Sequence, residues 1–312
     1  MKKRRLLSLL GVVVLATGLF AGCSSSNTTS TKTTETITVT DRNGEVEVPK
    51  NPERVVVLDY GSLDIMDDLG IEAIGVPKSN LPEYLSEYKN EKYTDIGGVK
   101  EFNFETINSI EPDLIIIEGR QAESYDELSK IAPTLYLGST GSDYYNGLKD
   151  NAEILGKIFD KEKELADKFS SFDSRINTIN EKVKSENLNA LVSMVSDGSM
   201  SVYGSGSRYN LIFNELGFTP TDDSIQVSNH GQSISNEYLA EKNPGYLFVL
   251  DKGQITGSNA QPAKEIVENE LVKTTDTYKN GNIVYLDTQA WYVGGAGFKA
   301  LDKMLSDIEN AL

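Results

Sequence analysis

The stretch DKEKELADKFSSFDSRINTINEKVKSE, residues 160–186, lies near the middle of the chain and predicts one long amphipathic helix. No Pro or Gly interrupts it, and the Asp160 carboxylate can cap its first turn by accepting backbone N–H hydrogen bonds. At ~1.5 Å per residue the helix would be roughly 40 Å long. Apolar residues recur along it at spacings of three and four, which places them on one face; they are Leu165, Phe169, Phe172, Ile176, Ile179 and Val183.

The segments on either side of this helix, residues 37–159 and 187–312, have the pattern of alternating strands and helices. Expected strands such as VVVL at 55–58 and LIII at 114–117 are apolar throughout, which is typical of parallel strands covered on both faces. A β-hairpin is expected around Asn43-Gly44. We therefore predict an α/β fold with two Rossmann-like lobes that the long helix joins, with a ligand cleft between them. The alternative is a surface helix of one larger domain.

The first 22 residues have the pattern of a lipoprotein signal peptide. Basic residues at positions 2–5 precede an apolar segment at 6–20, and the sequence Leu-Phe-Ala-Gly-Cys that ends at Cys23 resembles a bacterial lipobox. An ordinary secretory signal is the alternative. Residues 23–36 would then be a lipidated Cys23 followed by a flexible Ser/Thr-rich tether. Such an anchor would hold an extracytoplasmic protein at the outer face of the bacterial cytoplasmic membrane.

Composition excludes several classes of function. The 312 residues carry a net charge of −17, which argues against nucleic acid as a partner because phosphate binding needs a basic face. An anionic small ligand is still compatible, since a few cations in a cleft can dominate locally. One Cys and one His exclude an internal disulfide, a four-ligand Cys or Cys/His zinc site and a three-His catalytic zinc site.

An internal repeat relates the two expected lobes. ETINSIEPDLIIIEGR at 105–120 aligns with EYLAEKNPGYLFVLDKG at 237–253 when Pro112 is placed on Pro244, and Arg120 then falls on Lys252. Each cation comes three residues after a buried strand, at the sheet edge where open α/β folds bind ligands. Two lobes facing across a cleft would each contribute one cation. Surface salt bridging is the alternative role for both side chains.

The chain resembles the iron-siderophore substrate-binding lipoproteins of ABC transporters, a family of class III periplasmic-binding-protein type with a helical backbone between the lobes. The resemblance covers essentially the whole mature chain and is closest to catecholate and petrobactin binders. The stretches that carry it are PKNPERVVVLDYGSLD (49–64), EPDLIIIEGRQAESYDELSKIAPTLYLG (111–138), GSRYNLIFNELG (206–217), SNHGQSISNEYL (228–239), NPGYLFVLDKG (243–253) and YLDTQAWYVGGAG (285–297).

The resemblance implies a cationic triad in the cleft. Arg120 and Arg208 match two family arginines, and Lys252 stands where the family usually has a third. Lys keeps the charge but lacks the planar fork that donates two hydrogen bonds at once. His230 and Tyr292 match residues that can occupy iron sites left open by a tetradentate catecholate, and otherwise have structural roles. Further expected lining residues are Trp291, Tyr60 and Gln121.

The implied function is binding without catalysis. The ligand would be an Fe(III) complex of a catecholate siderophore, with no intrinsic cofactor, delivered by a monomeric protein to a membrane permease that a separate ATPase powers. Haem, cobalamin or a free divalent metal are the alternative ligands. A secreted hydrolase is the alternative from another class, and its only base of the Ser/His type would be His230.

Overall fold

The computed structural model describes residues 35–138, 142–257 and 261–312, which belong to one compact unit. The expected signal peptide, the lipidation site Cys23 and all but the last residues of the expected tether lie outside these described residues. Within them, no helix combines the length and apolar character that crossing a membrane requires.

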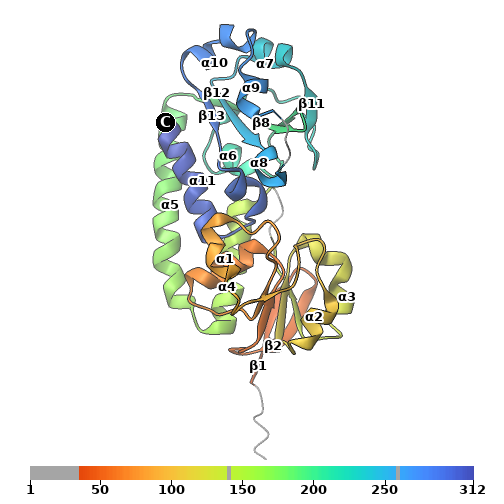
Figure 1. The fold of residues 1–312 in the computed structure, drawn as a ribbon. Coiled ribbons are helices and arrows are strands. Elements are labelled where there is room, and N and C mark those ends of the chain that lie inside the picture. Colours follow the sequence, from red (N-terminus) through yellow and green to blue (C-terminus); the bar gives the residue numbers. More distant parts are fainter. Residues whose placement is uncertain (1–34, 139–141, 258–260) are drawn as a thin grey trace, which may run out of the picture. The chain divides into compact units, whose positions relative to one another are not determined.

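A hairpin and a five-stranded parallel sheet form the first half of this unit (Figure 1). The hairpin pairs β1 (Thr36–Asp41) with β2 (Gly44–Pro49), and Gly44 supplies the positive φ of its turn, which confirms the expectation at Asn43-Gly44. In the sheet, each neighbouring pair of strands is parallel. Its order is β5 (Thr94–Asp95), β4 (Gly75–Val76), β3 (Val55–Val57), β6 (Leu114–Ile117) and β7 (Thr134–Tyr136).

Helices cover both faces of this first sheet, because alternate residues of a strand point to opposite sides. Ile115 packs in one apolar cluster with residues of α2 (Phe104–Ser109) and α3 (Tyr125–Leu128). Its neighbour Ile116 belongs to the main core, together with residues of α1 (Tyr60–Asp68) and α4 (Tyr144–Phe159). The short 3-10 helices η1 (Glu83–Lys89) and η2 (Gly119–Ser124) follow strands β4 and β6.

The second sheet is mixed. Its centre is parallel, as expected, and consists of β8 (Asn189–Ser196), β12 (Tyr246–Asp251) and β13 (Ile283–Tyr285), with β10 (Thr219–Pro220) also parallel to β8. The antiparallel edge made by β9 (Ser199–Tyr203) and β11 (Gln232–Ile234) was not expected. The helices of this half are α6 (Asn210–Asn214), α7 (Asn236–Lys242), α8 (Gly253–Thr256), α9 (Ala263–Val267), α10 (Asp276–Lys279) and α11 (Phe298–Ala311), with the short η3 (Val272–Thr274) and η4 (Gln289–Val293).

The long helix α5 spans Glu162–Ser185, within two residues of the expected range at each end. The expectation that Asp160 caps it was wrong. Asp160 ends α4 with a left-handed φ of 55°, and Lys161 occupies the N-cap of α5 without a side-chain hydrogen bond. The Asp160 carboxylate instead pairs with Lys50 Nζ at 2.6 Å and accepts from Asn51 Nδ2 at 2.7 Å. The tight turn from α4 into α5 requires this conformation, which Asp tolerates better than most residues.

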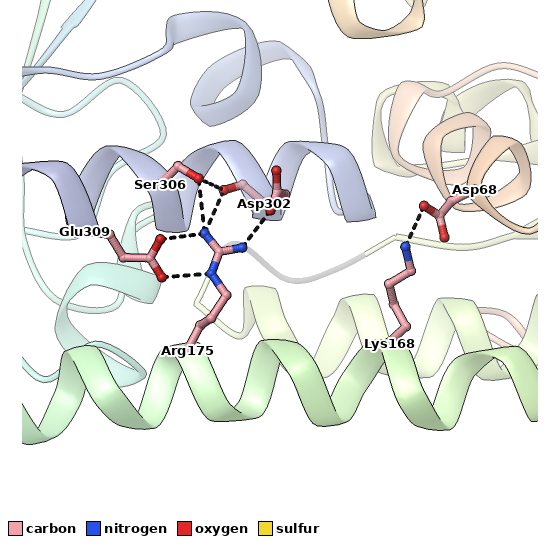
Figure 2. Close-up of polar contacts among 6 residues, drawn as sticks. All are labelled: Asp68, Lys168, Arg175, Asp302, Ser306 and Glu309. Atoms are coloured by element: carbon pink, nitrogen blue, oxygen red, sulfur yellow. Dashed lines mark hydrogen bonds and ion pairs between the residues drawn. The ribbon is translucent and has the colours of Figure 1, made fainter.

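Hydrogen bonds and ion pairs connect α5 to the helices α11 and α1 (Figure 2). Arg175 donates to both Glu309 carboxylate oxygens at 2.7 Å, to Asp302 Oδ1 at 2.6 Å and to Ser306 Oγ at 3.1 Å, all on α11. Seven residues earlier on α5, Lys168 Nζ lies 2.6 Å from Asp68 at the end of α1. The helix therefore contacts elements from both halves of the unit.

A second connection joins the halves through α1 and α11. Asp64 of α1 is fully buried and accepts from the backbone N–H groups of Lys299 and Ala300, at 3.0 and 2.9 Å, in the first turn of α11. A β-carbon added at Gly297 would lie 2.3 Å from the Asp64 carboxylate, so the approach requires glycine there. One apolar core continues from the first sheet through α1, α4, α5 and α11 to the second sheet. The long helix is thus one of several links between the halves.

Candidate ligand-binding site

One cavity of about 470 Å³ receives residues from both halves of the described unit. From the first half come the turn after β6 and the segment that leads into α4; from the second come the turn after β9, a loop before β11, and the segment between β13 and α11. The lining residues with polar, charged or aromatic side chains are Glu118, Arg120, Ser142, Tyr144, Ser207, Arg208, Ser228, Asn229 and Trp291.

Arg120 stands in the turn that follows β6. Its Nη1 lies 3.1 Å from Glu118 Oε1, and the two side chains are 28% and 25% exposed. Gln121 holds this turn: its Oε1 accepts from the Glu118 backbone N–H at 3.0 Å, and its Nε2 donates to the carbonyls of Leu58, at 3.1 Å, and Val99. Gln121 is buried and absent from the lining, so its contacts are those of a residue that positions Arg120.

Arg208 reaches the cavity from the second half. Its Nη2 donates to the Tyr292 carbonyl at 2.9 Å, and its guanidinium carbon lies 4.6 Å from the centre of the Tyr292 ring. The preceding turn is fixed by Asn210, which accepts from the Gly206 backbone N–H and donates to the Ser142 carbonyl, both at 2.8 Å. Cation–π stacking and a backbone acceptor therefore orient Arg208 at the cavity.

Trp291 lines the cavity but is largely buried, and its indole Nε1–H donates to Asp307 Oδ2 at 2.9 Å. It lies in η4, a single π-helical turn at Gln289–Val293, a feature often found at functional sites. Tyr60 is only 1% exposed, and its hydroxyl donates to the Ser79 carbonyl. Burial raises the pKa of Tyr60 far above its usual value, although the Arg120 charge opposes this rise.

Lys252 and His230 also lie outside the cavity lining. Lys252 is half-buried, and its backbone N–H donates to the Val195 carbonyl at 3.0 Å. His230 is exposed, one residue beyond the lining segment that ends at Asn229, and its backbone N–H donates to Ser228 Oγ at 3.2 Å.

Of the eight expected site residues, the cavity brings together Arg120, Arg208 and Trp291. The other five are absent from its lining, although Gln121 and Tyr292 contact lining residues and His230 follows one in the chain. Ligand roles for all eight stay predictions. Among the described residues, no group of three or more His, Cys, Asp or Glu is placed to hold a metal ion.

Sequence reasoning missed Glu118, Tyr144 and Val227. Glu118 could have been found from its place directly after the buried strand β6. Tyr144 donates to the Gly295 carbonyl at 3.0 Å and so ties the start of α4 to the opposite wall. Val227 is 66% exposed and lines the cavity, and because single exposed apolar residues are common on protein surfaces, no local signal in the sequence pointed to it.

The buried carboxyl group of Asp59, which lies near Glu118 and Arg120, should make the stability of the protein depend on pH. Burial raises its pKa to about 7, and the Glu118 charge adds to the rise, while the Ser62 hydrogen bonds and the Arg120 charge oppose it. The unfolded chain titrates this carboxyl near ~3.9, so between the two values the folded protein binds more protons. The free energy of unfolding should therefore fall as the pH rises from about 4 to about 7.

The substitution Asp59→Asn should remove this contribution. Urea unfolding of both proteins at pH 5 and pH 8 should show a smaller loss of stability for the variant between the two pH values. Asp126→Asn, at an exposed carboxylate on α3, is the control and should keep the wild-type difference. Equal losses in wild type and Asp59→Asn would contradict the prediction.

Arg120 and Arg208 reach one cavity from the two halves of this α/β unit, a geometry that fits the class of solute-binding proteins. Within that class, the chain belongs to the periplasmic binding protein family, whose model matches residues 55–290. It is 43% identical over 317 residues to the petrobactin-binding protein YclQ of Bacillus subtilis, an alignment that covers 100% of this chain and 99% of the relative.

Solved structures agree with this assignment. The crystal structure of YclQ superposes with a TM-score of 0.85 at 44% identity, over 89% of this chain and 98% of that one. The crystal structure of the periplasmic catecholate-siderophore-binding protein VctP of Vibrio cholerae superposes with a TM-score of 0.84 at 37% identity. The superposition covers 88% of this chain and 100% of that one. A second relative by sequence is the ferric-anguibactin-binding protein FatB of Vibrio anguillarum. It is 31% identical over 280 residues, which cover 88% of this chain and 87% of the relative.

Proposed function

We propose that this protein captures an Fe(III) complex of a catecholate-type siderophore outside the cytoplasm and delivers it to an ABC importer. The observation that supports this most is the placement of Arg120 and Arg208, which reach one cavity from the two halves of the fold. A ferric tris-catecholate carries about three negative charges, and its transfer out of water is costly unless cations meet it. Guanidinium groups also stack on flat aromatic rings such as catechol.

The relatives support the same class of ligand, since their names specify petrobactin, catecholate siderophores and ferric anguibactin. Haem and cobalamin, the alternative ligands, have no counterpart in these names. The protein would act as a carrier without catalysis or a resident cofactor. Its proposed partners are a membrane permease with a separate ATPase, and the membrane itself through a lipid on Cys23 that anchors a monomer at its outer face.

The single tryptophan of the chain provides the test, because Trp291 lines the cavity. Tryptophan fluorescence should be quenched saturably by ferric catecholates at micromolar concentration or below, after subtraction of the effect on free N-acetyltryptophanamide. A neutral ferric tris-hydroxamate and haemin serve as comparison ligands. Recovery of the catecholate chemically unchanged would support carriage over catalysis. The absence of saturable quenching by any ferric catecholate, or a Soret shift with haemin at lower concentration, would contradict the proposal.

A further inference from the structure

The cavity in which an anionic ligand is expected is lined by the carboxylate of Glu118. We propose that Glu118 is an internal anion that pairs with Arg120 in the cavity and lowers the affinity for anionic ligands in proportion to their charge. The inference rests on the proposed function, because it assumes that the ligand is a ferric siderophore. It assigns to this site a residue that sets affinity and charge selectivity.

The contact itself is the first observation. Glu118 Oε1 and Arg120 Nη1 are 3.1 Å apart, and both residues line the cavity. Only about a quarter of each side chain is exposed, so solvent screens the pair incompletely. A ligand oxygen that binds Arg120 Nη1 must compete with this carboxylate, and one that binds the other N–H groups of Arg120 lies close to a like charge.

The charge balance of the cavity is the second observation. Among the described lining residues, the charged side chains are Arg120, Arg208 and Glu118, which together give one net positive charge. Neutralising Glu118 would double that net charge without adding a cation. A trianionic ligand would gain most from the change, and a neutral ligand would gain nothing.

The buried surroundings of Glu118 strengthen the electrostatic effect of its charge, because they contain little water. Asp59 is buried beside it, and its Oδ2 has no hydrogen-bond partner among the described residues. Burial is the main cause of the raised pKa of Asp59, and the nearby Glu118 charge adds to it, as expected for two carboxyls in a poorly solvated region. The same charge acts on the cavity side of the Glu118 carboxylate.

Glu118 also has a structural role, and the test must separate the two. It forms a capping box with Gln121 at the start of η2. The variant Glu118→Gln keeps this role, because its amide oxygen can still accept a backbone N–H hydrogen bond. If Glu118 mattered only for the turn, its replacement would lower the affinity of the protein for every ligand. The proposal instead predicts a higher affinity for anionic ligands.

The experiment measures dissociation constants of wild type and Glu118→Gln for a trianionic ferric tris-catecholate and a neutral ferric tris-hydroxamate at two salt concentrations. We expect the variant to bind the trianion about tenfold more tightly or better, with a steeper salt dependence and an unchanged constant for the neutral complex. Glu123→Gln changes the net charge equally at an exposed residue outside the lining, and should match wild type. Glu118→Ala, which lacks the cap, should show the same direction of change.

The possible outcomes distinguish the role of Glu118 from the proposed function. If wild type binds ferric catecholates and Glu118→Gln binds the trianion equally or more weakly, the role of Glu118 is refuted while the proposed function stands. An equal gain for the neutral complex would indicate relief of crowding and would also refute it. If wild type binds no ferric catecholate, the proposed function fails and this inference fails with it.

Discussion

Replacement of Arg208 by alanine should weaken the binding of a ferric catecholate by about 100-fold. A 100-fold loss corresponds to about 2.7 kcal/mol, which lies within the range of about 1.5–3 kcal/mol that one hydrogen bond to a charged group contributes. Arg208 is already oriented by the Tyr292 carbonyl and the Tyr292 ring, so little conformational entropy is lost when the ligand arrives. Fluorescence titration of the variant, which retains Trp291, measures the change directly.

Arg42→Ala is the matched control for this variant. Like Arg208, Arg42 donates to a backbone carbonyl, that of Gly138 at 2.9 Å, and lies over a tyrosine ring, that of Tyr136 at 5.9 Å. Arg42 is absent from the lining of the cavity that holds Arg208. We expect Arg42→Ala to bind the ligand as wild type does. A similar loss in both variants, or in neither, would contradict a specific role for Arg208.

Replacement of Phe298 by alanine should lower the free energy of unfolding by about 3–5 kcal/mol, the usual range for a buried phenylalanine. Phe298 is 1% exposed in the first turn of α11. Its ring stacks on Phe172 at 6.1 Å and meets the edge of Phe169 at 5.7 Å, both on α5. The substitution would leave a cavity where the core passes between the two halves. Equilibrium unfolding in urea, followed by circular dichroism, provides the measurement.

We also expect the variant to unfold in a single transition, because the apolar core is continuous from one sheet to the other. Leu271→Ala, at a residue that is 39% exposed, is the control and should change stability by no more than about 0.5 kcal/mol. Two separate transitions for Phe298→Ala would show that the halves fold independently, and the account of a shared core would then be wrong.

Much of the fold could be predicted from local periodicity. The stripe from Leu165 to Val183 located α5 because its apolar residues face the shared core, and only Phe169 of the six remains partly exposed. The role of Asp160 could not be predicted in this way, since it depends on the turn from α4 and on Lys50, which is distant in the sequence. The antiparallel edge strand β11 has few apolar residues and gave no strand pattern.

The site was predicted less completely. Arg120 was found because a buried strand ends just before it, and Arg208 through its match to the family. The repeat placed Lys252 opposite Arg120, yet the two turns differ: β6 continues into a 3-10 turn that Gln121 holds, whereas β12 continues into α8. Glu118 aligns with the buried Leu250 in the same repeat, so the repeat alone could not predict a carboxylate in the cavity.

The location of the iron tests the central claim most directly. Crystals of the protein grown with a ferric catecholate, measured on both sides of the iron absorption edge, would place the metal by anomalous scattering. We expect one iron peak inside the cavity, with catecholate oxygens within hydrogen-bond distance of Arg120 and Arg208. An iron peak elsewhere on the protein, for example in the groove lined by Asp41, Arg42 and Tyr136, would contradict it.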